Sequence, residues 1–254
     1  MNAIELGRVF ADAEVAALYR YRPPYPQQVF AILERIIVEP RFVLDAGAGT
    51  GALARTLASS VIRVDAIDPS AAMVARGRAL PGGDHPHIRW VEGRAEDGPL
   101  SPPYGLIVAG AALHWMELGV VMPRFRAALA PDARLAIVDT EAVHPSGPLR
   151  DAQLDIIRRY SPLQDHVETP DMVAMLVERG LFALQGQERT APVAFEQSID
   201  DVLHRLHSTS TLSRVTLGDR LEAFDAEMRA AFRTHGIDRA RFDVVGYVAW
   251  GRPA

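Results

Sequence analysis

The chain has 254 residues, of which 48% are apolar and 23% are charged, and it contains no cysteine. This balance is typical of a globular protein with an ordinary hydrophobic core and not of a disordered chain. The lack of cysteine excludes disulfides, thiolate metal sites and cysteine nucleophiles. The sequence also lacks lysine, which excludes Schiff-base chemistry and a lysine general base.

The formal net charge of −5 at pH 7 disfavours double-stranded nucleic acid as a partner, because such binders normally present a basic surface. The N-terminal sequence has no basic start followed by an apolar run, so it does not resemble a signal peptide. No stretch approaches the roughly 18 apolar residues of a membrane span. We therefore expect a cytoplasmic protein, monomeric or homodimeric, that binds neither nucleic acid nor membranes.

In the first half of the chain, short Val- and Ile-rich runs alternate with segments whose apolar spacing is typical of amphipathic helices. Strands are predicted at Arg41–Ala46, Ile62–Ile67, Ile88–Glu92, Gly105–Ala109 and Arg134–Asp139. Helices are predicted at Gly51–Ser59, Ser70–Leu80 and Val120–Leu129. This alternation predicts an α/β fold with a parallel sheet that is buried on both faces.

After Asp139 the pattern loosens, although periodic segments continue. Helices are predicted at Asp151–Arg159, Pro170–Arg179, Ile199–Ser208 and Leu217–Thr234, and strands at Leu181–Arg189 and Phe242–Trp250. A helical section therefore interrupts a sheet that closes near the C-terminus. We predict one domain over residues 1–254, with helices inserted into it.

A glycine-rich loop follows the first predicted strand, in the sequence VLDAGAGTG of Val43–Gly51. Its three glycines permit a tight turn and let a ligand approach the backbone closely. The spacing differs from the G-x-G-x-x-G fingerprint of dinucleotide sites. Asp45, two residues before the first glycine, would repel a pyrophosphate. It suits a ligand that carries an amino group, or a loop whose N–H groups need a hydrogen-bond acceptor.

Acidic residues also follow the next two predicted strands. Asp68 ends the second strand, where a carboxylate can accept hydrogen bonds from both hydroxyls of a ribose; the alternative is a cap for the helix that follows. The loop Gly93–Asp97 after the third strand would face an adenine. These strand ends share the carboxyl edge of the sheet, where ligands bind in such folds.

Four motifs together resemble the class I S-adenosylmethionine-dependent methyltransferases. They resemble in particular the small-molecule group typified by trans-aconitate methyltransferases and the methyltransferase type 11 domain. The motifs are the lead-in Phe10…Tyr19…Arg22-Pro23-Pro24-Tyr25-Pro26, LDAGAGTG, AIDPS at Ala66–Ser70, and AALHW at Ala111–Trp115. The resemblance covers Phe10–Asp139 and the closing strand near Phe242.

The resemblance implies a doubly wound, mostly parallel sheet of seven strands whose last strand is antiparallel, with S-adenosylmethionine as cofactor. Residues 1–40 would cap the cofactor, residues 41–139 would bind it, and inserted helices at about 146–180 and 197–234 would form a substrate lid. The implied cofactor-binding residues are Tyr19, Arg22, Tyr25, Asp45, Gly47, Ala48, Gly49, Thr50, Gly51, Asp68, Pro69, Arg94, Ala95, Glu96 and Ala109.

Within that set, the resemblance implies that Asp68 holds the ribose and that the Ala95 N–H meets the adenine. One position departs from the family. Many relatives carry an aspartate before this alanine to hold the adenine amino group, whereas this chain has Arg94. Because an arginine only donates hydrogen bonds, it cannot take that role, and Glu96 is the candidate substitute.

The methyl group of the cofactor is already activated, so transfer requires in-line alignment with the acceptor and exclusion of water. His114 is the candidate general base if the acceptor must lose a proton. Alternatively, His114 and Trp115 form a structural wall of the substrate site. His144, after the fifth strand, is a second candidate for contact with the substrate.

Other motifs are set aside. Ser101-Pro102-Pro103-Tyr104 resembles the signature of nucleic-acid amino-methyltransferases but precedes the fourth strand, where that family places it afterwards. His204 and His207 could share a helix face, but a third metal ligand is not evident. Ala109-Gly110 stand where catechol-type relatives need an acid, so no metal is expected.

The expected reaction is methyl transfer to a small-molecule acceptor, with oxygen preferred over nitrogen and carbon by family habit. Alternatives are a non-catalytic cofactor-binding protein, an NAD-dependent oxidoreductase and an aminopropyl transferase. In the predicted lid, Arg205, Arg214 and Ser208–Thr211 could bond an oxygen-rich acceptor, although surface solvation would also explain them.

Overall fold

The computed structural model describes residues 8–162 and 169–254, and these form two compact units built from interleaved segments. The sheet unit comprises described residues within 24–141, 167–191 and 245–254. The helical unit comprises those within 1–23, 142–166 and 192–244. Each unit is described by itself below.

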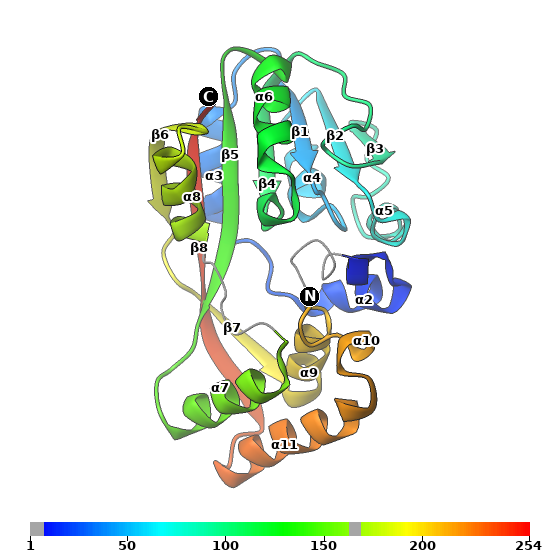
Figure 1. The fold of residues 1–254 in the computed structure, drawn as a ribbon, viewed down its shortest axis with the longest axis vertical. Coiled ribbons are helices and arrows are strands. Elements are labelled where there is room, and N and C mark those ends of the chain that lie inside the picture. Colours follow the sequence, from blue (N-terminus) through cyan, green and yellow to red (C-terminus); the bar gives the residue numbers. More distant parts are fainter. Residues whose placement is uncertain (1–7, 163–168) are drawn as a thin grey trace. The chain divides into compact units, whose positions relative to one another are not determined.

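The sheet unit contains the strands that were predicted to be parallel (Figure 1). They are β1 (Phe42–Ala46), β2 (Arg63–Asp68), β3 (Ile88–Glu92), β4 (Tyr104–Gly110) and β5 (Leu129–Val143). β1 pairs in parallel with β2 and β4, β2 with β3, and β4 with β5. The strand order β3-β2-β1-β4-β5-β8-β6 departs from chain order where β1 meets β4, and this creates a switch point at the carboxyl edge of the sheet.

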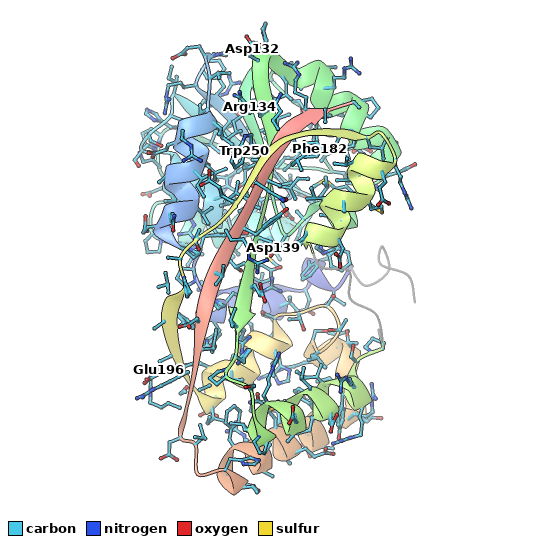
Figure 2. The ribbon with its side chains drawn as sticks, turned by 90° about the vertical axis from the view of Figure 1, so that its left-hand side faces the viewer. Asp132, Arg134, Asp139, Phe182, Glu196 and Trp250 are labelled. Carbon is cyan, nitrogen blue, oxygen red and sulfur yellow. The ribbon has the colours of Figure 1, made fainter. Side chains whose placement is uncertain are left out.

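The sheet continues with β8 (Arg239–Pro253), which pairs antiparallel with β6 (Phe182–Arg189). Figure 2 shows β6 and β8 side by side, with Phe182 and Trp250 among their residues. Trp250 lies opposite Gly186, where a Cβ would come within 2.3 Å of the indole ring, so the ring packs on bare backbone. The predicted mixed sheet with an antiparallel strand is confirmed.

Helices cover both faces of this sheet. α3 (Gln27–Ile36) and α4 (Ala52–Leu57) pack on one face through one apolar cluster. α6 (Leu118–Ala128) and α8 (Thr169–Glu178) pack on the other face through a second cluster. α5 (Ala71–Ala79) begins at Ser70, whose hydroxyl accepts from the Met73 N–H and caps the helix. The doubly wound arrangement predicted from the sequence is therefore confirmed.

One segment of the predicted lid belongs to the sheet unit. α8 lies within the range 146–180 that was expected to cover the substrate, but its residues Met172, Val173 and Leu176 are buried in the cluster beneath the sheet. Because this apolar face packs on β-sheet residues, α8 completes the core. Of that range, the helical unit retains α7 (Pro148–Tyr160).

The helical unit encloses a third apolar cluster. Its other elements are η1 (Arg8–Ala11), α2 (Ala13–Leu18), η2 (Tyr19–Tyr21), β7 (Val193–Ser198), α9 (Ile199–His207), α10 (Arg214–Leu217), η4 (Gly218–Arg220) and α11 (Leu221–Thr234). β7 pairs with Arg239–Val244 of β8 and was not predicted. One helix was predicted at Leu217–Thr234, but in the structure its first turn is not part of α11. Gly218, at φ 53°, ends α10, and α11 begins at Leu221.

No helix among the described residues is both long enough and apolar enough to cross a membrane.

Candidate functional site

The glycine-rich loop joins β1 to α4, and its backbone is bent as the sequence predicted. Gly47, Gly49 and Gly51 have φ angles of 71°, 56° and 73°, in the region that glycine adopts without steric cost. The N–H groups of Gly47 and Ala48 both donate to the carbonyl of Ile67, at 2.9 and 3.0 Å. The loop is thus fixed against the end of β2.

At two of these positions, close packing also requires glycine. A Cβ on Gly47 would lie 2.5 Å from the Cβ of Ala112, in the turn after β4. A Cβ on Gly51 would lie 2.4 Å from the indole ring of Trp90 on β3. The loop therefore sits in contact with the ends of two other strands, and any side chain at these positions would push them apart.

Asp45 lies next to the last residue of β1, within the core, and is only 1% exposed. Its Oδ2 accepts a hydrogen bond from the Ala54 N–H at 3.0 Å, in the first turn of α4. Burial, opposed by that hydrogen bond and supplemented by the nearby charge of Asp68, raises the pKa of Asp45 to about 7. Asp45 therefore ties the strand to the helix.

Asp68 lies at the carboxyl end of β2 and connects the glycine-rich loop to the start of α5. Its Oδ2 accepts from the Gly49 N–H and its Oδ1 accepts from the Ser70 N–H, each at 2.8 Å. Burial raises the pKa of Asp68 above its ordinary value, and the two N–H donors oppose that rise. The carboxylate is thus held rigidly beside the glycine loop, and each oxygen retains capacity for another donor.

A small cavity opens between the glycine loop and the end of β4. Its volume is about 20 Å³, room for about one water molecule. Its lining comprises Tyr25, Asp45, Gly47, Ala48, Ala52, Leu53 and Gly110. Sequence reasoning named the first four and missed the last three. Gly110 could have been found, because it ends a strand directly before the AALHW motif.

The loop after β3 holds the residues predicted to meet the adenine. Ala95 is buried, whereas Arg94 is exposed and pairs with Glu96 at 3.0 Å. Oε1 of Glu96 also accepts from the Glu117 N–H at 3.0 Å. Both carboxylate oxygens of Glu96 thus already have hydrogen-bond partners. To hold the adenine amino group in place of the missing aspartate, Glu96 would have to give up one of these partners.

The remaining predicted residues of the sheet unit lie around the same edge. Thr50 is buried, and Pro69, which follows Asp68 in the sequence, is exposed. Ala109 is fully buried in β4, so its side chain belongs to the core. His114 and Trp115 form a single turn, η3 (Leu113–Trp115), with ring centroids 4.5 Å apart and the histidine exposed.

Tyr19, Arg22 and His144 belong to the helical unit, whereas Tyr25 belongs to the sheet unit. Within its unit, Arg22 donates from Nε to the Ser208 hydroxyl at 3.0 Å and from Nη2 to the Ser208 carbonyl at 2.8 Å. Its guanidinium also lies 4.1 Å from the centre of the Tyr19 ring. Contact of these residues with a cofactor stays a prediction.

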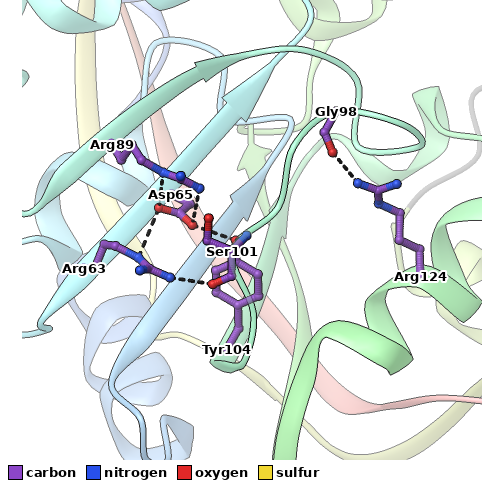
Figure 3. A network of polar contacts seen from close by, with 7 residues as sticks. All are labelled: Arg63, Asp65, Arg89, Gly98, Ser101, Tyr104 and Arg124. Carbon is purple, nitrogen blue, oxygen red and sulfur yellow. Dashed lines mark hydrogen bonds and ion pairs between the residues drawn. The ribbon is translucent and has the colours of Figure 1, made fainter.

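Two motifs that were set aside have structural partners. His207 is buried, and its ring nitrogens contact the Leu212 carbonyl and Asp225, each at 2.9 Å, so neither is available to a metal. The Ser-Pro-Pro-Tyr motif ends in Tyr104, whose hydroxyl donates to Asp65 and accepts from the Ser101 N–H (Figure 3). This geometry anchors the segment before β4 to the middle of β2.

Comparisons with known proteins find similarity to methyltransferases. A family model described as a methyltransferase domain matches residues 43–133, which run from β1 into β5 and include the glycine loop and Asp68. An uncharacterised methyltransferase of Mycobacterium tuberculosis is 31% identical over 158 residues, covering 62% of this chain and 63% of its own length. This chain therefore spans less than two thirds of the length of that curated relative.

A malonyl-[acyl-carrier protein] O-methyltransferase of Halalkalibacterium halodurans is 33% identical over 85 residues, covering 31% of each chain. Among solved structures, one from Anaeromyxobacter dehalogenans described as a type II methyltransferase has a TM-score of 0.65 and 26% identity, covering 91% of this chain and 97% of its own. The YcgJ protein of Bacillus subtilis, at 18% identity and a TM-score of 0.53 over 90% of this chain and 100% of its own, shares the fold. Residues 43–133 therefore resemble a methyltransferase domain, and the chain is similar to methyltransferases in sequence and in fold.

Proposed function

We propose that this protein transfers the methyl group of S-adenosylmethionine to a small-molecule acceptor. The observation that carries the proposal is the position of Asp68, held by the Gly49 and Ser70 N–H groups at the carboxyl end of β2. A carboxylate fixed there beside a glycine loop has the position and hydrogen-bonding capacity to receive the two hydroxyls of a ribose. The similarity of residues 43–133 to a methyltransferase domain supports the same cofactor.

The residues at this edge fit the chemistry of the cofactor. Asp68 would accept from the ribose, and the loop of Gly47–Gly51 would face the methionine portion, with Asp45 supporting it from below. Tyr25 would border the same region from the segment before α3, since it lines the cavity beside the loop. The buried Ala95 would present its N–H to the adenine. Arg94 does not fit the family pattern, so the adenine amino group has no assigned partner from that position.

The cofactor, when bound, supplies a methyl group that is already activated by a positively charged sulfur. The protein's own task is then to align the acceptor and exclude water. His114, exposed on the turn after β4, is positioned by its contact with Trp115 and is our candidate for removing a proton from an oxygen acceptor. Oxygen is our preferred acceptor atom, as in the O-methyltransferase of Halalkalibacterium, and carbon is the alternative, as in a similar C-methyltransferase of Rubrivivax gelatinosus.

The first test is calorimetric titration of the protein with S-adenosylmethionine, S-adenosylhomocysteine and NADH. We expect both adenosyl ligands to bind and NADH not to bind. Asp68→Ala should weaken adenosyl binding about 10- to 100-fold, the loss of charge-assisted hydrogen bonds worth ~1.5–3 kcal/mol. The control is Asp84→Ala, an exposed carboxylate of the sheet unit, which should bind as the wild type does.

The outcomes separate the alternatives. NADH binding without adenosyl binding would indicate an oxidoreductase. Folded protein that binds none of the three would refute the proposed cofactor, and adenosyl binding without turnover of any acceptor would favour a non-catalytic protein. Once an acceptor is found, His114→Ala should reduce turnover about 100-fold or more if the histidine is a base. A small, pH-independent effect would instead assign it to the wall of the site.

A further inference from the structure

The loop after β3, residues 93–98, forms a tight turn in the sheet unit, and we call it the adenine loop. The Gly93 N–H donates to the Asp68 carbonyl at 3.0 Å, and the Gly98 N–H donates to the Arg94 carbonyl at 2.8 Å. A Cβ on Gly98 would lie 2.6 Å from that same carbonyl oxygen, so the turn leaves no room for a side chain there. The two ends of the loop are therefore held together by its own backbone.

This turn sets the direction of the Ala95 N–H. The peptide bond between Arg94 and Ala95 is trans, so its C=O and N–H point in opposite directions. Because the carbonyl is held by the Gly98 N–H inside the turn, the Ala95 N–H points away from the turn. Ala95 is 4% exposed, and its N–H makes no hydrogen bond within the described ranges. A buried donor without a partner is suited to an acceptor on a ligand, such as a ring nitrogen of adenine.

Arg124 fastens the adenine loop from α6. Its Nη1 donates to the Glu96 carbonyl at 3.1 Å, and its Nη2 donates to the Gly98 carbonyl (Figure 3). A guanidinium presents its N–H groups in a planar, rigid fork, so the two contacts fix both carbonyls relative to the helix. Among residues 8–162 and 169–254, Arg124 makes no ion pair, and these carbonyls are the partners of its charge.

The Glu96 side chain fastens the loop at a second point. It is only 10% exposed, and its Oε1 accepts from the Glu117 N–H at 3.0 Å. Glu117 is the N-cap residue of α6 and lies about two helical turns before Arg124, so both contacts are made by one side of the helix. Oε2 of Glu96 accepts from Nε of Arg94 at 3.3 Å. The carboxylate is thus directed toward α6 and Arg94.

From these contacts, and resting on the proposed function, we infer that Arg124 and Glu96 are positioning residues for the adenine of the cofactor. Arg124 holds the carbonyl of Gly98, and the N–H of Gly98 holds the carbonyl that orients the Ala95 N–H. Glu96 closes the loop onto α6 and does not bind the 6-amino group of adenine, because its carboxylate is directed elsewhere. The site therefore recognises the adenine ring through the backbone and discriminates little at position 6 of the purine.

The first test is amide hydrogen exchange of the full chain without ligand, read by mass spectrometry of peptides that contain residues 93–98. Arg124→Met should speed exchange in these peptides about 10-fold or more, because the contacts that hold the turn are lost. Arg124→Lys should restore part of the protection, since an ammonium group can still donate to a carbonyl. Arg126→Met is the matched control, an exposed arginine of the same helix, and should exchange as the wild type does.

The second test compares S-adenosylhomocysteine with its 6-deamino analogue, in which purine replaces adenine, by calorimetric titration. The wild type should bind the two within about 3-fold of each other, since no side chain of the loop takes the amino group. Arg124→Met should weaken both about 10-fold and leave their ratio unchanged. Glu96→Gln should also weaken both by one factor, a smaller one because the amide keeps an acceptor oxygen for the Glu117 N–H.

Unchanged exchange of the adenine loop in both Arg124→Met and Glu96→Gln would overturn the inference, and so would faster exchange spread evenly over the sheet unit. A wild type that prefers S-adenosylhomocysteine more than about 10-fold over the analogue, with the preference lost in Glu96→Gln, would instead make Glu96 an adenine ligand. If neither ligand binds the wild type, the proposed function fails, whereas the exchange measurement still decides whether Arg124 fastens the loop.

Discussion

Replacement of Asp65 by asparagine tests the buried polar network of the sheet unit (Figure 3). Asp65 is 1% exposed and accepts from Nε and Nη2 of Arg89 at 2.9 and 2.8 Å, and from the Tyr104 hydroxyl at 2.6 Å. Arg63 approaches the same carboxylate at 3.2 Å. An asparagine would keep one acceptor oxygen but would direct an NH₂ group at these donors.

The expected loss follows from how buried the partners are. Breaking a fully buried ion pair costs ~3–5 kcal/mol, because the remaining charge is left unpaired. The side chains of Arg89 and Arg63 are 44% and 29% exposed, so water can replace part of the interaction. We therefore expect Asp65→Asn to lower the free energy of unfolding by ~2–3 kcal/mol, which corresponds to ~5–10 °C in unfolding temperature for a chain of this size.

Tryptophan fluorescence is a selective probe, because Trp90, Trp115 and Trp250 all belong to the sheet unit. Urea unfolding of Asp65→Asn, Tyr104→Phe and the double variant would form a cycle. The two substitutions should be coupled by at least ~0.5 kcal/mol, since they remove two ends of one hydrogen bond. Additive effects, or a loss below ~0.5 kcal/mol for Asp65→Asn, would refute the reasoning.

Three other substitutions test the site and the core. Gly47→Ala should lower the free energy of unfolding in urea by ~2 kcal/mol or more and should weaken adenosyl binding. The reason is that residue 47 has a positive φ and that an added Cβ would lie 2.5 Å from the Cβ of Ala112. The control is Gly119→Ala, whose added Cβ would meet nothing within 4 Å. The raised pKa of Asp45, about 7 against 3.8 in the unfolded chain, means that the native state binds more protons between these values. The free energy of unfolding should therefore fall as pH rises from about 4 to 7. Asp45→Asn should flatten this dependence on pH. An unchanged slope in the variant would show that other groups cause the dependence. His207→Phe should cost ~1–3 kcal/mol by calorimetry, because a buried carbonyl and a carboxylate lose their shared partner, and a neutral outcome would show that water replaces the ring.

The core of the sheet was predictable because its signals are local. β1, β2 and β4 are short apolar runs, and each is followed by breaker residues or a glycine loop. Apolar periodicity and the residues that end a strand can both be seen in a short stretch of neighbouring residues. The position of Asp68 at a strand end follows directly from such a pattern. Sequence alone therefore predicted which strand ends meet at the carboxyl edge of the sheet.

Elements whose burial depends on distant partners were harder to predict. β7 has only one buried residue, and that residue, Gln197, is polar, so the sequence carries no apolar strand signal there. The strand forms by pairing with residues 239–244 of β8, which lie far along the chain. α8 has an apolar face that periodicity can detect, but periodicity does not say which core receives that face. The contact of Arg22 with Ser208 joins residues 186 positions apart, and nothing local to either one indicates it.

α3 is a different case. Its buried residues Val29, Phe30, Ile32, Leu33 and Ile36 follow helical spacing, so the signal was present in the sequence. Because the proline-rich motif just before this helix resembles the family's lead-in, residues 1–40 were predicted to cap the cofactor and no helix was predicted here. The structure assigns this helix to the sheet unit, where it buries one face against the strands.

The long strand β8 has a consequence for synthesis of the protein. Its residues Arg239–Val244 pair with β7 in one unit, and its residues Tyr247–Pro253 pair with β6 in the other. Neither unit can complete its strand pairing until this segment has left the ribosome. A nascent chain that stalls before residue 239 would leave the edges of both β6 and β7 open, and such edges are aggregation-prone and invite chaperones.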